Sequence, residues 1–248
     1  MTRRVSPSAA PGSGANESTG NSIFFGWVVV AAAFCVTLVG FGSAYSFSAF
    51  IDALQQDFGA SRGAVALVFS LAGFLYFSLG VITGPMADRW GSKPLAITGM
   101  VLVSAGLFFS GLANSLPQIY LAYGLGIGLG VGCAYVPAVG AVQRWFLRRR
   151  GFASGLAVSG IGIGTLVMPA LATLVIETAG WRQAYFVLAG IAVVLGVGMA
   201  FLLENDPGKR GLGPRGPRAR GPQTHVADAD GSTRRTAGAR SVDLRRAR

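Results

Sequence analysis

The sequence predicts an all-α membrane protein with six transmembrane helices. Hydrophobic residues make up 52% of the chain and charged residues only 12%, which is about half of the charged share usual in soluble domains. Six apolar stretches follow one another between Phe24 and Leu203. Each is long enough to cross ~30 Å of hydrocarbon as a helix, so the bilayer is the first predicted partner of the chain.

The apolar runs and the polar residues between them define the predicted organisation. The six spans cover residues 24–50, 63–86, 94–113, 117–143, 151–176 and 183–203. Residues 1–23 are polar and are predicted to be a disordered cytoplasmic N-terminus. Residues 204–248 are rich in Gly, Pro, Ala and Arg and poor in large aliphatic side chains. Such a composition does not bury enough apolar surface to fold, so a disordered, basic cytoplasmic tail is predicted.

The distribution of positive charge sets the expected orientation. The formal net charge is +11, and eleven of the 21 Lys and Arg residues follow Leu203. Before that point, eight Lys or Arg residues precede the odd-numbered spans, whereas only Arg62 and Arg182 lie on the alternate side. Cytoplasmic loops carry the excess of positive charge, so both termini are predicted to be cytoplasmic in a cell membrane. No aromatic residues interleave with the tail arginines, which argues against nucleic acid as a partner.

The residues available for catalysis or metal binding are few. The single histidine, His225, lies in the predicted tail, and both cysteines, Cys35 and Cys133, lie inside predicted spans. These positions exclude a histidine-based triad or a histidine-ligated metal within the bundle. The sequence therefore predicts no enzyme, no metal site and no cofactor.

An internal repeat divides the spans into two triplets. Gly42-Ser-Ala-Tyr45 in the first span is similar to Gly132-Cys-Ala-Tyr135 in the fourth, and Arg62-Gly63 before the second is similar to Arg150-Gly151 before the fifth. An odd number of spans in each repeat makes the two triplets inverted, as in secondary transporters. The predicted fold is therefore an inverted three-plus-three repeat.

Small residues recur every four positions in the fourth and fifth spans. The stripes are Gly124, Gly128 and Gly132; Gly126 and Gly130; Gly151, Gly155 and Ser159; and Gly160 and Gly164. Such spacing allows close approach of membrane helices. A phosphate-binding loop at 124–130 is the alternative, but no Gly-Lys-Ser/Thr ending follows it.

The segment between the second and third spans carries most of the recognisable chemistry. It runs Gly84-Pro-Met-Ala-Asp88-Arg89-Trp-Gly91-Ser-Lys93-Pro94. Asp88 is a carboxylate near the membrane surface, where it is expected to pair with a cation or a helix N-terminus. Gly91 allows a tight turn, and Pro94 suits the first turn of the following helix.

This segment resembles the signature loop of the major facilitator superfamily, in which the residues matching Gly84, Asp88, Arg89, Gly91 and Lys93 form a gating loop. Residues 144–160, which open with a basic motif, are similar to the monocarboxylate porter and oxalate/formate antiporter branch of that family. The basic residues of the motif are Arg144, Arg148, Arg149 and Arg150. They are expected chiefly to determine topology, and attraction of anions is a lesser alternative. The fold implied is the N-terminal six-helix domain of a major facilitator protein.

The chain also departs from the family pattern. Lysine is absent from the first span, which favours the oxalate/formate side of the branch, and the family has twelve helices rather than six. No Asp, Glu, Lys, Arg or His lies in the middle of any predicted span, although such residues are the usual markers of ion pathways. The resemblance thus implies one wall of a transport cavity, with the main anion-binding charges on a second half.

Three function classes follow from these observations. The first is secondary active transport of small organic anions, mono- or dicarboxylates, by alternating access, with a coupled proton as a further candidate and with a homodimer or a separate second half completing the cavity. The polar residues predicted to line that cavity are Tyr45, Ser48 and Tyr135, although hydrogen bonding between helices would explain them equally well. The second is a truncated, transport-incompetent fragment or a membrane interaction partner, and a membrane enzyme is the least favoured.

Overall fold

Six helices long and apolar enough to cross a membrane occur in the part of the chain that the structure describes, as the hydrophobic runs predicted. The computed structural model describes residues 21–146 and 149–204, with side chains from Phe25 onward. Most of the predicted disordered N-terminus, Arg148 and the predicted basic tail after Glu204 lie outside the described residues. So does the second of the two units into which the chain divides, Pro217–Arg248.

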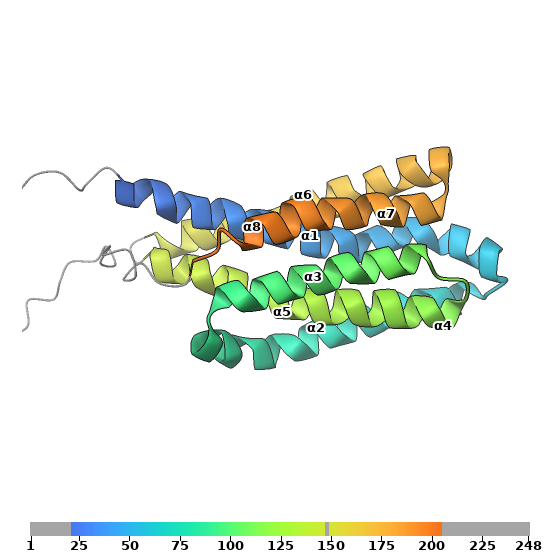
Figure 1. Ribbon diagram of the computed structural model, residues 1–248, viewed down its shortest axis with the longest axis horizontal. Coiled ribbons are helices and arrows are strands. Elements are labelled where there is room, and N and C mark those ends of the chain that lie inside the picture. The colour runs from blue at the N-terminus through green and yellow to red at the C-terminus, as the bar shows by residue number, and fades with distance from the viewer. Residues whose placement is uncertain (1–20, 147–148, 205–248) are drawn as a thin grey trace, which may run out of the picture. The chain divides into compact units, whose positions relative to one another are not determined.

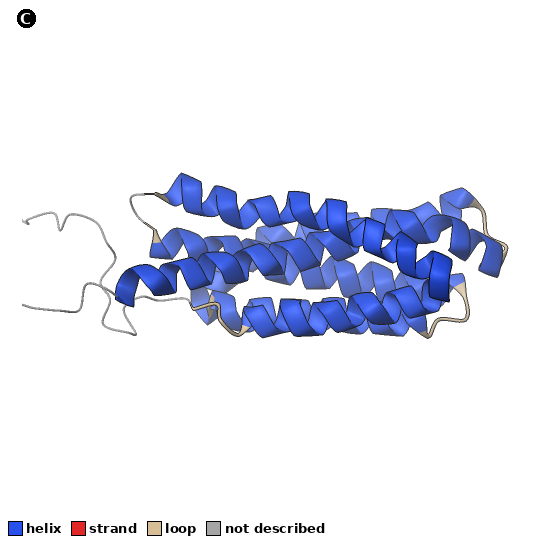
Figure 2. Ribbon diagram, turned by 90° about the horizontal axis from the view of Figure 1, so that it is seen from above, coloured by secondary structure: helices blue, strands red, loops and turns tan. Residues whose placement is uncertain are grey.

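The described elements are all helical (Figure 2). In chain order they are α1 (Asn21–Phe58), α2 (Arg62–Trp90), α3 (Ser92–Gly111), α4 (Leu116–Ile119), η1 (Tyr120–Leu125), α5 (Gly126–Trp145), α6 (Arg150–Ala179), α7 (Trp181–Ile191), η2 (Ala192–Val197) and α8 (Gly198–Ala200). The π-helical segments η1 and η2 are continuous with their neighbours, so 116–145 and 181–200 each form one spanning helix.

The helices differ from the predicted spans at their ends. The first helix begins at Asn21 and continues to Phe58, eight residues beyond the predicted end. Half of the residues in this extension are polar: Asp52, Gln55, Gln56 and Asp57. Hydropathy detects the part of a helix that lies in hydrocarbon, so it misses turns that continue into the interface. The sixth span is shifted instead, with helix from Trp181 to Ala200 rather than 183–203.

Successive helices alternate in direction (Figure 1). The first residues of α1 and the end of α8 lie at the same end of the bundle, together with the α2–α3 joint. The indole N–H of Trp145 donates a hydrogen bond to the Glu204 carbonyl at 2.8 Å, and the rings of Trp145 and Phe25 are 5.3 Å apart. These contacts tie the start of α1, the end of α5 and the end of the sixth spanning helix together. This end corresponds to the predicted cytoplasmic side.

Glycines bring α1 and α6 into backbone contact. A Cβ added at Gly160 would meet the Phe34 carbonyl, and one added at Gly164 would meet the Leu38 carbonyl. The Thr37 hydroxyl donates to the Ala157 carbonyl at 2.7 Å across the same interface. Small residues thus permit an approach that any side chain would prevent, as the stripe of Gly160 and Gly164 predicted.

Glycines of η1 and α5 allow close packing against two neighbouring helices, α2 and α3. The stripe of Gly124, Gly128 and Gly132 faces α2, where a Cβ at Gly128 would lie 2.8 Å from the Leu75 Cβ. The other stripe, Gly126 and Gly130, faces α3. The predicted helix-packing role of both stripes is confirmed.

The stripe at the start of α6 behaves differently. A Cβ added at Gly151 or Gly155 would meet nothing within 4 Å, and Ser159 is exposed. The close helix approach predicted for these residues does not occur within the described bundle, and it stays a prediction for a further helix. They lie on a face of α6 that no described helix covers, whereas Gly160 and Gly164 occupy the face turned toward α1.

The joints between α2 and α3 and between α6 and α7 share one geometry. Each is a single glycine, Gly91 with φ 94° and ψ 154° and Gly180 with φ 89° and ψ 163°. Each donates its N–H to a carbonyl four residues earlier, that of Ala87 at 2.9 Å and that of Ile176 at 3.0 Å. Positive φ at both positions favours glycine. The joints lie at opposite ends of the bundle (Figure 1), as an inverted repeat requires.

The repeated Gly-x-x-Tyr segments also pack equivalently. A Cβ added at Gly42 on α1 would lie 2.6 Å from the Met168 Cγ on α6, and one added at Gly132 on α5 would lie 2.8 Å from the Leu79 Cβ on α2. The first helix of each triplet therefore packs on the second helix of the other. The inverted three-plus-three repeat accounts for both contacts.

We predict that Gly164→Ala destabilises the protein, because the new methyl group would collide with the Leu38 carbonyl of α1. Overpacking of this kind typically costs about 1–3 kcal/mol. Reversible unfolding in mixed micelles measures the change. Gly162→Ala is the matched control, since its Cβ meets nothing within 4 Å; equal stability of the two variants would contradict the close α1–α6 approach.

Candidate functional site

The predicted gating loop is mostly helix. The second helix continues through Gly84 and Pro85 to Trp90, so Gly84, Asp88 and Arg89 lie within it, and Lys93 lies in the first turn of α3. The prediction of a loop opening at Gly84 is therefore wrong. Proline removes only one helical hydrogen bond, and an apolar environment favours keeping the others. The turn itself is reduced to Gly91, and Pro94 falls in the first turn of α3 as expected.

The carboxylate of Asp88 forms an ion pair between helices. The Arg144 guanidinium donates a hydrogen bond to the Asp88 Oδ1 at 2.7 Å, linking the last turn of α2 to the last turn of α5. A negative charge at a helix C-terminus is opposed by the macrodipole, and Arg144 compensates for it. The expectation that Asp88 pairs with a cation is confirmed. Two motifs that lie 56 residues apart in the sequence therefore meet in one contact.

The other described basic residues of these two motifs lie at helix ends. Arg89 and Lys93 are exposed on either side of the α2–α3 joint. Arg149 precedes the first residue of α6, Arg150 is that first residue, and both are exposed. The Arg144–Asp88 pair is itself open to solvent, with exposed side-chain fractions of 34% and 73%. Its contribution to stability is therefore expected to be modest.

At the opposite end of the bundle, Arg182 joins three helices. Its guanidinium lies 3.2 Å from the Asp57 carboxylate on α1, donates to the Ala113 carbonyl after α3 at 3.4 Å, and lies 4.1 Å from the centre of the Trp181 ring. A second pair, Arg62–Asp52, is 3.4 Å long and exposed. Sequence reasoning missed both acidic partners because the first span was predicted to end at residue 50.

Two of the predicted cavity residues lie in an aromatic cluster on α1, α2 and α5. Tyr45 is 40% exposed, and its ring meets Phe69 of α2 edge-on at 5.6 Å. Tyr135 of α5 meets Phe41 of α1 edge-on at 5.0 Å, and Phe41 also contacts Tyr76 of α2 at 5.7 Å. The sequence analysis missed Phe41, although its position one turn before Tyr45 places it on the same side of α1.

The third cavity candidate, Ser48, is exposed and donates its hydroxyl to the Tyr45 carbonyl at 3.0 Å. Tyr45 and Ser48 therefore both present polar atoms at the surface of α1, while Tyr135 is half-buried. The apolar groove between α3 and the sixth spanning helix has none of these three residues in its lining. Their contact with a substrate stays a prediction.

The helical fold, the inverted repeat and the paired Asp88 define the class of protein. Residues 32–242 match the model of the Major Facilitator Superfamily. The chain belongs to this superfamily.

The named relatives of the chain include monocarboxylate transporters and an efflux protein. Human monocarboxylate transporter 11 is 35% identical over 196 residues, which cover 79% of this chain and 42% of that protein. Human monocarboxylate transporter 14 is 31% identical over 207 residues, covering 84% and 41%, and the fujikurins efflux protein of Gibberella fujikuroi is 34% identical over 176 residues, covering 68% and 37%. The chain thus spans about two fifths of the length of these relatives. Their transporter names agree with the prediction that the chain is not an enzyme.

A solved structure supports the fold. The inward-open xylose transporter XylE from E. coli aligns with a TM-score of 0.63 at 17% identity, covering 74% of this chain and 48% of that one. At this identity the likeness concerns the fold alone. It agrees with the predicted six-helix domain of a major facilitator protein.

We predict that Asp88→Asn and Arg144→Gln are energetically coupled, because each removes the same hydrogen-bonded ion pair. A double-mutant cycle should give a coupling of about 0.2–1 kcal/mol for an exposed pair. Reversible unfolding in mixed micelles at low and high salt measures it. Arg149→Gln supplies the control, and additive effects of the Asp88 and Arg144 variants would refute a stabilising contact.

Proposed function

We propose that this chain is the N-terminal half of a secondary active transporter that moves small organic anions, mono- or dicarboxylates, by alternating access. The observation that carries the proposal is the ion pair of Asp88 with Arg144 at one end of a major facilitator fold. This exposed ion pair joins the last turns of α2 and α5, and an exposed ion pair can break and re-form at little free-energy cost. The names of the monocarboxylate transporters related to the chain support the substrate class, and the oxalate/formate side of the branch is the preferred assignment.

Two helices support the need for a second six-helix unit. In both α2 and α6, only 22% of the residues in the most apolar 18-residue stretch are buried inside the bundle, whereas 61% are buried in the corresponding stretch of α1. On α6 the exposed face carries Gly151 and Gly155, whose added Cβ atoms would meet nothing within 4 Å. Small residues spaced in this way suit the close approach of another membrane helix. A second copy of the chain or a separately encoded half would complete the cavity.

The working parts of the transporter follow from their positions. Tyr45, Ser48 and Tyr135 are proposed to line the cavity wall that this half contributes. The pair of Asp88 and Arg144 is proposed to open and close with the cytoplasmic gate. Both termini are proposed to lie in the cytoplasm, and the helices in a cell membrane. The Asp, Glu, Lys and Arg side chains in the described helices lie near helix ends, so the second half is proposed to supply the charges that bind the anion and, where a proton is coupled, its carrier.

The first test is uptake of labelled oxalate, formate, lactate and pyruvate into proteoliposomes that contain only this purified chain. We expect saturable uptake from dimeric preparations and none from monomers, because one six-helix unit forms a single wall of the cavity. Oligomeric state is measured in the same preparations, and protein-free liposomes give the background.

Saturable uptake by a monomer would contradict the need for a second unit. Failure of all four anions with both the dimer and a reconstituted pair of halves would contradict anion transport. It would favour a membrane protein that does not itself transport.

We predict that Asp88→Asn slows uptake by about fivefold to tenfold, or about 1–1.4 kcal/mol, without lowering the amount of inserted protein. Removing the charge releases Arg144 and leaves the gate without its closing contact. Asp52→Asn is the matched control, because Asp52 also pairs with an exposed arginine but at the opposite end of the bundle. Unchanged uptake by Asp88→Asn at equal insertion would remove Asp88 from the gate.

A further inference from the structure

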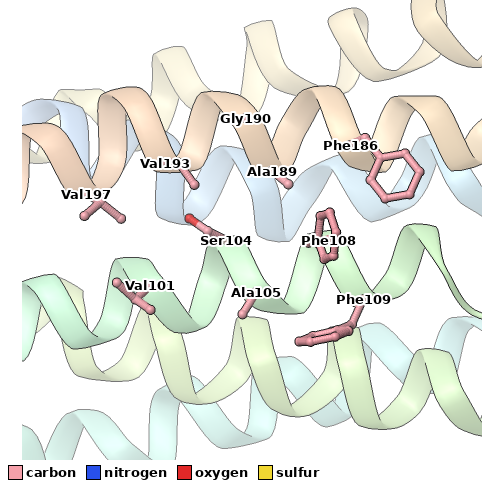
Figure 3. Close-up of a pocket in the computed structure, with 10 residues that line it drawn as sticks. All are labelled: Val101, Ser104, Ala105, Phe108, Phe109, Phe186, Ala189, Gly190, Val193 and Val197. Atoms are coloured by element: carbon pink, nitrogen blue, oxygen red, sulfur yellow. The ribbon is translucent and has the colours of Figure 1, made fainter.

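A groove of about 630 Å³ lies between α3 and the sixth spanning helix, away from the residues proposed for transport. Ser104 and Ala189 form its floor and are 6% and 5% exposed, while Gly190 and Val193 of the facing helix form one wall (Figure 3). The small side chains at the floor leave the recess that the larger side chains surround.

The residues that line the groove favour an apolar ligand. Ser104 is the only residue of the lining with a polar side chain, and its hydroxyl donates to the Met100 carbonyl at 2.8 Å. The groove therefore offers no unpaired side-chain donor. An apolar ligand loses no hydrogen bonds by entering it, whereas a polar ligand would leave its own groups unpaired.

Aromatic rings surround the groove toward the α3–α4 turn. The rings of Phe108 and Phe186 face each other across the two helices at 5.4 Å, and those of Phe108 and Phe109 are 5.8 Å apart. Gly111 allows the Phe186 ring to lie close to α3, since an added Cβ would be 3.0 Å from it. These rings give the groove a defined shape at this end, and Val101 and Val197 mark the other end (Figure 3).

The length of the groove matches one leaflet of a bilayer. Val101 lies at the middle of α3 and Phe109 lies near its end, so the lining spans about 12 Å along the helix axis. Half of the hydrocarbon layer is about 15 Å thick. With α3 crossing the bilayer, the groove would lie in the half of the membrane on the side of the α3–α4 turn.

We propose that this groove binds one acyl chain of a phospholipid from that leaflet. Its volume corresponds to on the order of twenty times the ~30 Å³ share of a water molecule, and a methylene group is of similar size. An acyl chain that runs the length of the groove therefore fits within it. The headgroup would lie at the interface beside the α3–α4 turn and the start of α7.

Shape complementarity, rather than the hydrophobic effect, would hold the acyl chain in the groove. An acyl chain gains no hydrophobic free energy on moving from lipid to an apolar protein surface. In the groove it makes dispersion contacts with a floor and walls instead of a single surface, and each contact adds a little attraction. Filling the recess with a side chain should therefore expel the lipid.

The experiment uses the full chain in phosphatidylcholine nanodiscs that contain a trace of phosphatidylcholine with a diazirine at the end of one acyl chain. After irradiation, mass spectrometry of peptides locates the labels. We expect labels concentrated on the groove residues of α3 and the sixth spanning helix. Gly190→Leu and, from the opposite wall, Ala105→Leu should each lower that labelling at least about fivefold.

Gly198→Leu is the matched control, since Gly198 lies in the same spanning helix, has open space beside it and is outside the lining. Its labelling should equal that of the wild type. Labels spread evenly over the exposed faces of α2 and α6, or groove labelling unchanged in both filling variants, would overturn the site. Absence of label from the groove in dimeric preparations, with label on the other lipid-facing surfaces, would assign the groove to a second copy of the chain instead. If one filling variant fails to fold, the other variant and the wild-type label map decide the outcome.

Discussion

Close contact between helix backbones is the constraint on which the rest of this bundle depends. Lipid tails are as apolar as leucine, so burial of apolar side chains between membrane helices supplies little driving force. Packing must come from short contacts instead, and here Gly160 and Gly164 bring α6 onto the carbonyls of α1. Glycines of α5 do the same toward α2 and α3. Substituents larger than hydrogen at these positions would separate the helices that carry Tyr45, Asp88 and Arg144.

The ion pair of Asp88 with Arg144 depends on that packing. Neither helix end is fixed by a long loop: α2 stops at Gly91, and α5 stops where Trp145 and Phe25 meet. Gly124 of η1 and Gly128 and Gly132 of α5 set the distance of this spanning helix from α2 up to the first half of α5. As a result, the two charged side chains reach each other at 2.7 Å without either being buried. A contact open to water is also one that water can replace at little free-energy cost, which is consistent with the gating role proposed for this pair.

The sequence predicted the fold more completely than the site. Apolar runs and the repeated Gly-x-x-Tyr segments were sufficient for six helices and an inverted repeat, since both depend on local composition and spacing. Helix ends were harder: the extension of α1 to Phe58 contains Asp52 and Asp57, and no hydropathy signal separates an interfacial turn of helix from a loop. Asp88 and Arg144 were each identified, but their pairing required knowing which helices pack together. The Arg182–Asp57 pair was missed because the first span was predicted to end before Asp57. The groove between α3 and the sixth spanning helix arises from side chains that local patterns do not distinguish from ordinary lipid-facing residues.

The two single-glycine joints have a mechanical meaning. Because only Gly91 separates α2 from α3, these two helices are joined with almost no connecting chain. Gly180 joins α6 to α7 in the same way at the other end of the bundle. In the transport cycle proposed above, the second and third helices of each triplet would pivot about these joints, so the two pivots would lie at opposite ends of the bundle.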